Sequence, residues 1–143
     1  MKKKRMFIML LFLAGVFSAC TKEKDLLIDN KWQLVGFVDV STGEMKEPES
    51  TNEYCYTLTF KKNRKWEGRS AANSIQGKYN VNYSKHSINI SIGTTTKKGC
   101  EYCDEELYIE SLPKIDSFSL QENELKLYYN NKQNYLLFKS QGI

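Results

Sequence analysis

Apolar and polar residues alternate along most of this chain, which is the pattern of β-strands that bury one face of a sheet. The alternation is cleanest from Tyr54 to Phe60. Residues 77–83 and 87–92 alternate on either side of the turn Ser84–His86 and form the best candidate for a hairpin. Further strands are expected at residues 32–40, 65–68, 116–120, 124–129 and 135–139.

One segment, residues 105–112, has the signals of a helix. Asp104 is placed as its N-cap, acidic residues occupy the first turn, and Pro113 follows the end. The predicted buried stripe comprises Leu107, Tyr108, Ser111 and Leu112. Short strands with a single mid-chain helix predict an α+β, mostly β fold, either a curved antiparallel sheet or a partly open barrel.

The first twenty residues follow a different pattern. Residues 2–5 are basic, Met6–Phe17 is apolar, and small residues precede Cys20. The apolar run is too short to span a membrane as a helix, and the whole pattern is typical of a cleaved signal peptide over residues 1–19. A cysteine at this point resembles the lipobox of bacterial lipoproteins, which implies that the thiol of Cys20 receives a diacylglycerol. An ordinary signal peptide cut near Cys20 is the alternative.

Removing the signal peptide changes the charge of the chain. The whole sequence has a net charge of +4, and the four basic residues at positions 2–5 account for all of it. A neutral mature chain offers no electrostatic surface for nucleic acid. Residues 20–29 are expected to be a lipidated linker and residues 30–143 a single domain. The expected location is the outer membrane, anchored by lipid, on the periplasmic face or the cell surface.

Residues 68–79 contain Gly68, Ser70, Asn73, Gly77 and Tyr79 in an order and spacing that resemble the META domain, or HslJ-like, family. The strand before them and the predicted helix and closing strands after them fit the same family. The two glycines are expected to give backbone freedom at the ends of an irregular crossover, and Asn73 to hold a loop by hydrogen bonds. The motif is interpreted as structural. The resemblance implies a mostly β fold and a link to envelope stress, without an assigned reaction.

The cysteines are the candidates for chemistry. Cys100 and Cys103 form a CxxC motif before the predicted helix, but the acidic residues around them disfavour a reactive thiolate. A zinc site made by these two cysteines with Cys55 and His86 is an alternative, although its spacing is not specific. Our hypothesis is a structural disulfide between Cys55 and either Cys100 or Cys103, because export places the domain in an oxidising compartment.

The sequence therefore predicts a lipid-anchored module of the cell envelope that binds an unknown envelope protein or small ligand. We expect no catalytic residues, no cofactor, no metal and no nucleic acid partner. A lipocalin-like carrier of a small hydrophobic ligand is the alternative function. A buried apolar cavity of about 300 Å³ or more would favour the carrier, and a filled interior would favour the binding module.

Overall fold

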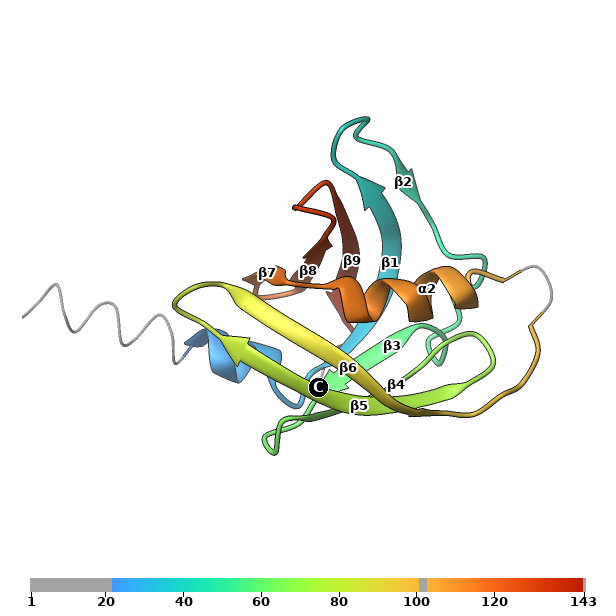
Figure 1. The fold of residues 1–143 in the computed structure, drawn as a ribbon, viewed down its shortest axis with the longest axis horizontal. Coiled ribbons are helices and arrows are strands. Elements are labelled where there is room, and N and C mark those ends of the chain that lie inside the picture. Colours follow the sequence, from blue (N-terminus) through green and yellow to red (C-terminus); the bar gives the residue numbers. More distant parts are fainter. Residues whose placement is uncertain (1–21, 101–102, 143) are drawn as a thin grey trace, which may run out of the picture.

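A computed structural model describes residues 22–100 and 103–142 of the chain. The predicted signal peptide and Cys20 lie outside these residues. Within these residues nine antiparallel strands form one sheet that curves into a ring, and the curved antiparallel sheet with one short mid-chain helix is the fold that the sequence predicted (Figure 1). The strands are β1 (Lys31–Asp39), β2 (Met45–Lys46), β3 (Thr57–Phe60), β4 (Lys65–Arg69), β5 (Ser74–Asn82), β6 (Ser87–Thr95), β7 (Ser117–Gln121), β8 (Glu124–Tyr129) and β9 (Asn134–Ser140).

The ring closes because β1 pairs with both β3 and β9. Strand β2 pairs only with β1, outside the ring. The shortest strand pairing in the ring is between β6 and β7, where Ser87 and Ser117 form the single residue pair. Helix α2 (Glu105–Ser111) and the 3₁₀ turn η1 (Leu112–Lys114) precede β7, and η1 packs against β6.

Large side chains fill the interior of the ring. The alternation in the sequence places every second residue of a strand inside, and burying each large apolar side chain contributes about 1.5–3 kcal/mol. Tyr108 of α2 enters the same core, where its ring lies edge-on to Tyr56 and close to Phe138. The bulkiest fully buried side chains are Trp32, Trp66, Tyr56, Tyr108, Phe60 and Phe138.

The segment expected to be a linker is partly built into the domain. Residues 22–27 are helical, and Leu27 is fully buried. The indole N–H of Trp32 donates to the carbonyl of Leu27 (3.3 Å), and the N–H of Asp29 donates to the carbonyl of Phe60 (2.8 Å). Apolar residues within the charged stretch explain the difference, because they cover the end of the core next to Trp32.

Two local predictions were wrong. Strand β3 begins at Thr57 rather than at Tyr54, because Tyr56 has a positive φ of 53° and interrupts the extended backbone. Leu107 is 39% exposed and is not part of the buried face of α2. Asp104 is the N-cap residue of α2, as predicted, but its side chain makes no capping bond, because its carboxylate accepts from Lys46 and from the Glu49 N–H instead.

The predicted crossover at residues 68–77 is a hairpin. Strands β4 and β5 pair directly, and only the loop 70–73 joins them. Neither Gly68 nor Gly77 needs a left-handed backbone. A Cβ on Gly68 would lie 2.1 Å from the carbonyl oxygen of Thr57, and one on Gly77 would lie 1.8 Å from that of Ser91. Both positions therefore require glycine because neighbouring backbone approaches too closely for a side chain.

Candidate functional site

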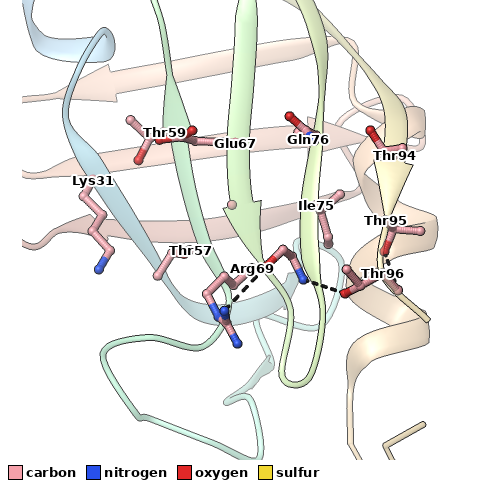
Figure 2. Close-up of a pocket in the computed structure, with 12 residues that line it drawn as sticks. Lys31, Thr57, Thr59, Glu67, Arg69, Ile75, Gln76, Thr94, Thr95 and Thr96 are labelled. Carbon is pink, nitrogen blue, oxygen red and sulfur yellow. Dashed lines mark hydrogen bonds between the residues drawn. The ribbon is translucent and has the colours of Figure 1, made fainter. Parts of the chain in front are cut away.

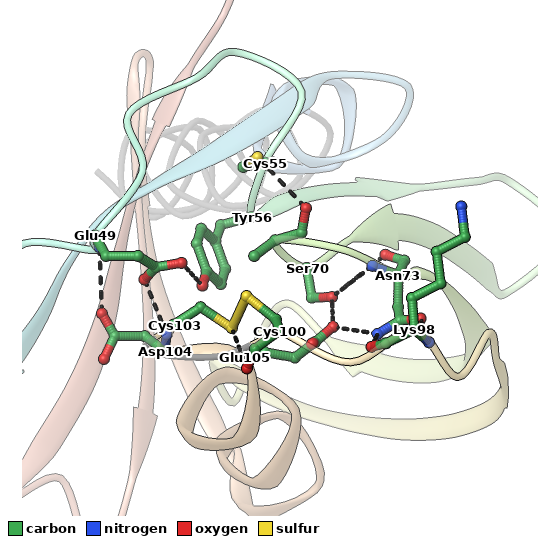
Figure 3. The surroundings of a disulfide bond; sticks show 11 residues. Glu49, Cys55, Tyr56, Ser70, Asn73, Lys98, Cys100, Cys103, Asp104 and Glu105 are labelled. Atoms are coloured by element: carbon green, nitrogen blue, oxygen red, sulfur yellow. Dashed lines mark hydrogen bonds between the residues drawn. A yellow bond between two sulfur atoms is a disulfide. The ribbon is translucent and has the colours of Figure 1, made fainter.

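The loop between β4 and β5 is part of the META-like motif, and its side chains form hydrogen bonds with residues on both sides of the CxxC (Figure 3). The Asn73 carboxamide oxygen accepts from the N–H of Lys98 (2.6 Å) and the hydroxyl of Thr96 (2.9 Å), and its amide nitrogen donates to the carbonyl of Lys98 (2.9 Å). The Asn73 amide and the Ser70 hydroxyl also donate to the carboxylate of Glu105. These bonds fasten both sides of the CxxC to the β4–β5 loop.

The structure pairs Cys100 with Cys103 in a disulfide. Our hypothesis of a bridge from Cys55 is therefore wrong. Cys55 lies against the β4–β5 loop, where its sulfur atom contacts the carbonyl of Ala71 (3.7 Å). The physical reason is that the Cα atoms of Cys100 and Cys103 lie 5.8 Å apart, a separation that suits a disulfide.

The carboxylate of Glu49, which no motif in the sequence marks, lies beside this disulfide. One carboxylate oxygen of Glu49 and the sulfur atoms of Cys100 and Cys103 all lie within 4.8 Å of one another. Glu49 comes from the loop after β2, and nothing in its spacing distinguishes it from other acidic residues. The His86 and Cys55 of the zinc alternative are not in this cluster, and the imidazole of His86 faces Glu23 at 3.2 Å.

Hydrogen bonds hold the Glu49 carboxylate in place. It accepts from the Tyr56 hydroxyl and from the N–H of Asp104 (2.9 Å). Burial, with a further contribution from Glu49, raises the pKa of Tyr56 far above its ordinary value, so that Tyr56 stays a donor. Partial burial raises the pKa of Asp104, but hydrogen bonds from Lys46 and Glu49 outweigh it, and the net pKa lies below its ordinary value.

A separate groove of about 570 Å³ lies on the outer face of the sheet (Figure 2). Its floor is a row of polar residues, each directly opposite the next across β1, β3, β4, β5 and β6. This row comprises Lys31, Thr59, Glu67, Gln76 and Thr94. A second row beside it comprises Thr57, Arg69 and Ser74. A second groove of about 540 Å³ shares Lys31 and is also lined mostly by polar residues.

This groove carries no signal in the sequence. The polar positions on the outer face of each strand were visible as alternation, but nothing in one strand shows which residues of another strand lie opposite. The row exists because the registers of four consecutive strand pairs place these residues directly opposite one another. Its side chains include both signs of charge, hydroxyls and an amide, which can donate and accept hydrogen bonds but offer no acid–base pair or nucleophile in an activated arrangement.

Comparisons with known proteins agree with this architecture. The family model of the META domain matches residues 25–142, and the chain therefore belongs to the META domain family. A Tannerella forsythia protein described as "Putative lipoprotein" is 31% identical over 137 residues, which cover 92% of this chain and 89% of the relative. The solved structure of a DUF4847 family protein from Bacteroides vulgatus shares the fold. Its TM-score is 0.63 at 18% identity, over 81% of this chain and 95% of that one.

The match to the family model begins at residue 25, which agrees with the burial of Leu27 in the core. Within residues 22–100 and 103–142, no helix has the length and hydrophobicity to cross a membrane.

Proposed function

We propose that the protein is a lipid-anchored binding module of the cell envelope, with no catalytic step, and that the groove across β1 and β3–β6 takes a polar ligand. The single observation that carries the proposal is the row of polar side chains in register along the floor of the groove. The lipobox-like Cys20 and the lipoprotein description of the Tannerella forsythia relative support the anchor.

The chemistry of the groove favours a ligand rich in hydroxyl or amide groups, such as an oligosaccharide or an extended peptide. Lys31 on β1 and Arg69 on β4 supply cationic donors, and Glu67, two residues before Arg69 on β4, supplies an acceptor. Neutral hydroxyls and an amide fill the remaining positions of the two rows. A hydrophobic ligand would leave these groups desolvated without partners, which costs about 1–3 kcal/mol for each group.

The carrier alternative receives less support. A carrier of a hydrophobic ligand needs an apolar internal cavity. The interior of the ring is occupied by fully buried aromatic side chains, among them Trp32, Trp66 and Tyr108. Both of the grooves described above are open to the surface and are lined mostly by polar residues.

The anchor is tested by Cys20→Ser. Because acyl chains need the thiol of Cys20, we expect this variant to lose the lipid and to leave the detergent phase in a Triton X-114 partition. A variant that keeps the same N-terminal mass and the same partition as the parent would contradict lipidation. The measurement is phase partition followed by mass spectrometry of the N-terminal peptide.

The groove is tested by a photo-crosslinking amino acid at position 76, which projects from β5 into the groove, in living cells. The matched control carries the same amino acid at Lys132, an exposed residue in the turn between β8 and β9. We expect an adduct from position 76 that Arg69→Glu removes. Identical adducts at both positions, or no adduct from position 76, would contradict ligand binding in the groove.

A further inference from the structure

We propose that Cys100 and Cys103, once reduced, bind one Zn²⁺ ion together with the carboxylate of Glu49. The three ligand atoms lie within 4.8 Å of one another. Two thiolates and one carboxylate are ligands that zinc accepts, and three protein ligands leave the fourth position of a tetrahedral site for water. This site lies apart from the groove and differs from the ligand set that the sequence suggested.

The surroundings hold the three ligands near one another before any ion arrives. The hydroxyl of Tyr56 and the N–H of Asp104 both donate to the Glu49 carboxylate. Such contacts behind a ligand fix its orientation, and losing one typically lowers metal affinity about 10–100-fold. Tyr56 is fully buried, so that its hydroxyl is a rigid support for Glu49.

Asn73 and Glu105 restrain the cysteines from either side. Asn73 binds the backbone of Lys98 two residues before Cys100, and Glu105, two residues after Cys103, accepts from the side chains of Ser70 and Asn73. Reduction of the disulfide therefore leaves the flanks of both thiols tied to the same loop. The sulfur atoms need to move only from bonding distance to the separation of two ligands on one ion.

Zinc is favoured over calcium or magnesium because thiolate ligands are soft, whereas those two cations bind oxygen. The acidic groups around the cysteines also favour a dication. Glu49 is itself a ligand, and Asp104 and Glu105 follow Cys103 directly in the chain. The negative charge around the cysteines disfavours a free thiolate, but a bound dication compensates this charge and stabilises both thiolates.

A dithiol supplies the two electrons that reduce the Cys100–Cys103 disulfide. The dithiol breaks the Cys100–Cys103 bond by exchange and becomes a cyclic disulfide, leaving two thiols on the protein. Binding of Zn²⁺ then forms two zinc–sulfur bonds and releases two protons, one from each thiol. Disulfide and zinc compete for the same two sulfur atoms, so the thiol redox state of the compartment decides whether the site binds metal.

The test uses the mature, detergent-solubilised protein, reduced with a dithiol that is then removed without oxygen. Titration with Zn²⁺ is expected to give one equivalent bound and two protons released in weakly buffered solution. Co²⁺ as a spectroscopic probe is expected to give a thiolate-to-cobalt charge-transfer band. The oxidised protein should bind neither ion.

Matched variants assign the ligands. Cys103→Ser should abolish the charge-transfer band or reduce it strongly, and Glu49→Gln should weaken zinc binding about tenfold or more. Cys55→Ser and Glu47→Gln, which change a cysteine and a carboxylate outside the cluster, should bind like the parent. Near-ultraviolet circular dichroism of each reduced variant shows whether it is still folded.

The proposal is overturned if the reduced, folded parent binds no zinc, or if Cys55→Ser weakens binding as much as Cys103→Ser does. It is also overturned if Glu49→Gln remains folded and binds zinc with the affinity of the parent.

Discussion

Replacing Gly77 with alanine tests how tightly β4, β5 and β6 pack. A Cβ at this position would lie 1.8 Å from the carbonyl oxygen of Ser91 and 2.8 Å from the indole nitrogen of Trp66. The same indole donates to that Ser91 carbonyl at 3.0 Å. A single methyl group therefore forces backbone apart and disturbs a hydrogen bond beside the core.

The magnitude follows from these two effects. Overpacking costs about 1–3 kcal/mol, and a lost hydrogen bond costs about 1 kcal/mol. We expect Gly77→Ala to lower the free energy of unfolding by about 2–4 kcal/mol. Gly93→Ala is the matched control, because its Cβ would meet nothing closer than 3.5 Å, and we expect a change within about 0.5 kcal/mol.

Urea unfolding followed by tryptophan fluorescence measures both variants, because Trp32 and Trp66 are almost completely buried. The midpoint and the slope should be compared, since a changed slope would mean a changed unfolded state. If Gly77→Ala and Gly93→Ala unfold at the same urea concentration, the close approach of Ser91 to Gly77 is not what requires glycine.

Two further predictions concern stability. Tyr79→Phe should cost about 1 kcal/mol in urea unfolding because its hydroxyl donates to the Lys61 carbonyl at 2.8 Å. Tyr83→Phe should be neutral or stabilising, because within the described residues its buried hydroxyl has no hydrogen-bond partner. An equal loss of stability in Tyr79→Phe and Tyr83→Phe would contradict this. A hydrogen bond from Lys139 holds the pKa of Glu124 below its ordinary value of 4.5. The pair therefore stabilises the fold above pH 4.5. This stabilisation is lost as the pH falls through the lowered pKa, because the Glu124 carboxylate is then protonated. Glu124→Gln should therefore lose about 0.5 kcal/mol at pH 7 but almost nothing at pH 2, and a pH-independent loss would refute the ion pair.

The strands were predictable because their signal is local. Alternation with period two located the hairpin of β5 and β6 and the three closing strands within a few residues. The predictions that failed depended on distant contacts. The glycines at 68 and 77 suggested backbone freedom, yet their reason is the approach of backbone from neighbouring strands. Leu107 fits an apolar stripe but lies beyond the part of α2 that the ring covers.

The candidate sites were less predictable than the fold. The CxxC was visible as a motif, but the partner of each cysteine depends on where the β4–β5 loop holds them. Glu49 carried no signal, because a carboxylate in a polar loop is common and becomes a candidate ligand only through its distance to two sulfur atoms.

The sequence by itself determined where strands form, the mid-chain helix, the resemblance to the META family and the expectation of a lipid anchor, because each depends on neighbouring residues in the chain. Only the tertiary structure decided the ring closure between β1 and β9, the polar row from Lys31 to Thr94, and the meeting of Glu49 with Cys100 and Cys103. The physical reason is that strand register and loop packing are set by the burial of the whole core. Residues far apart in the chain become neighbours only when that core has formed.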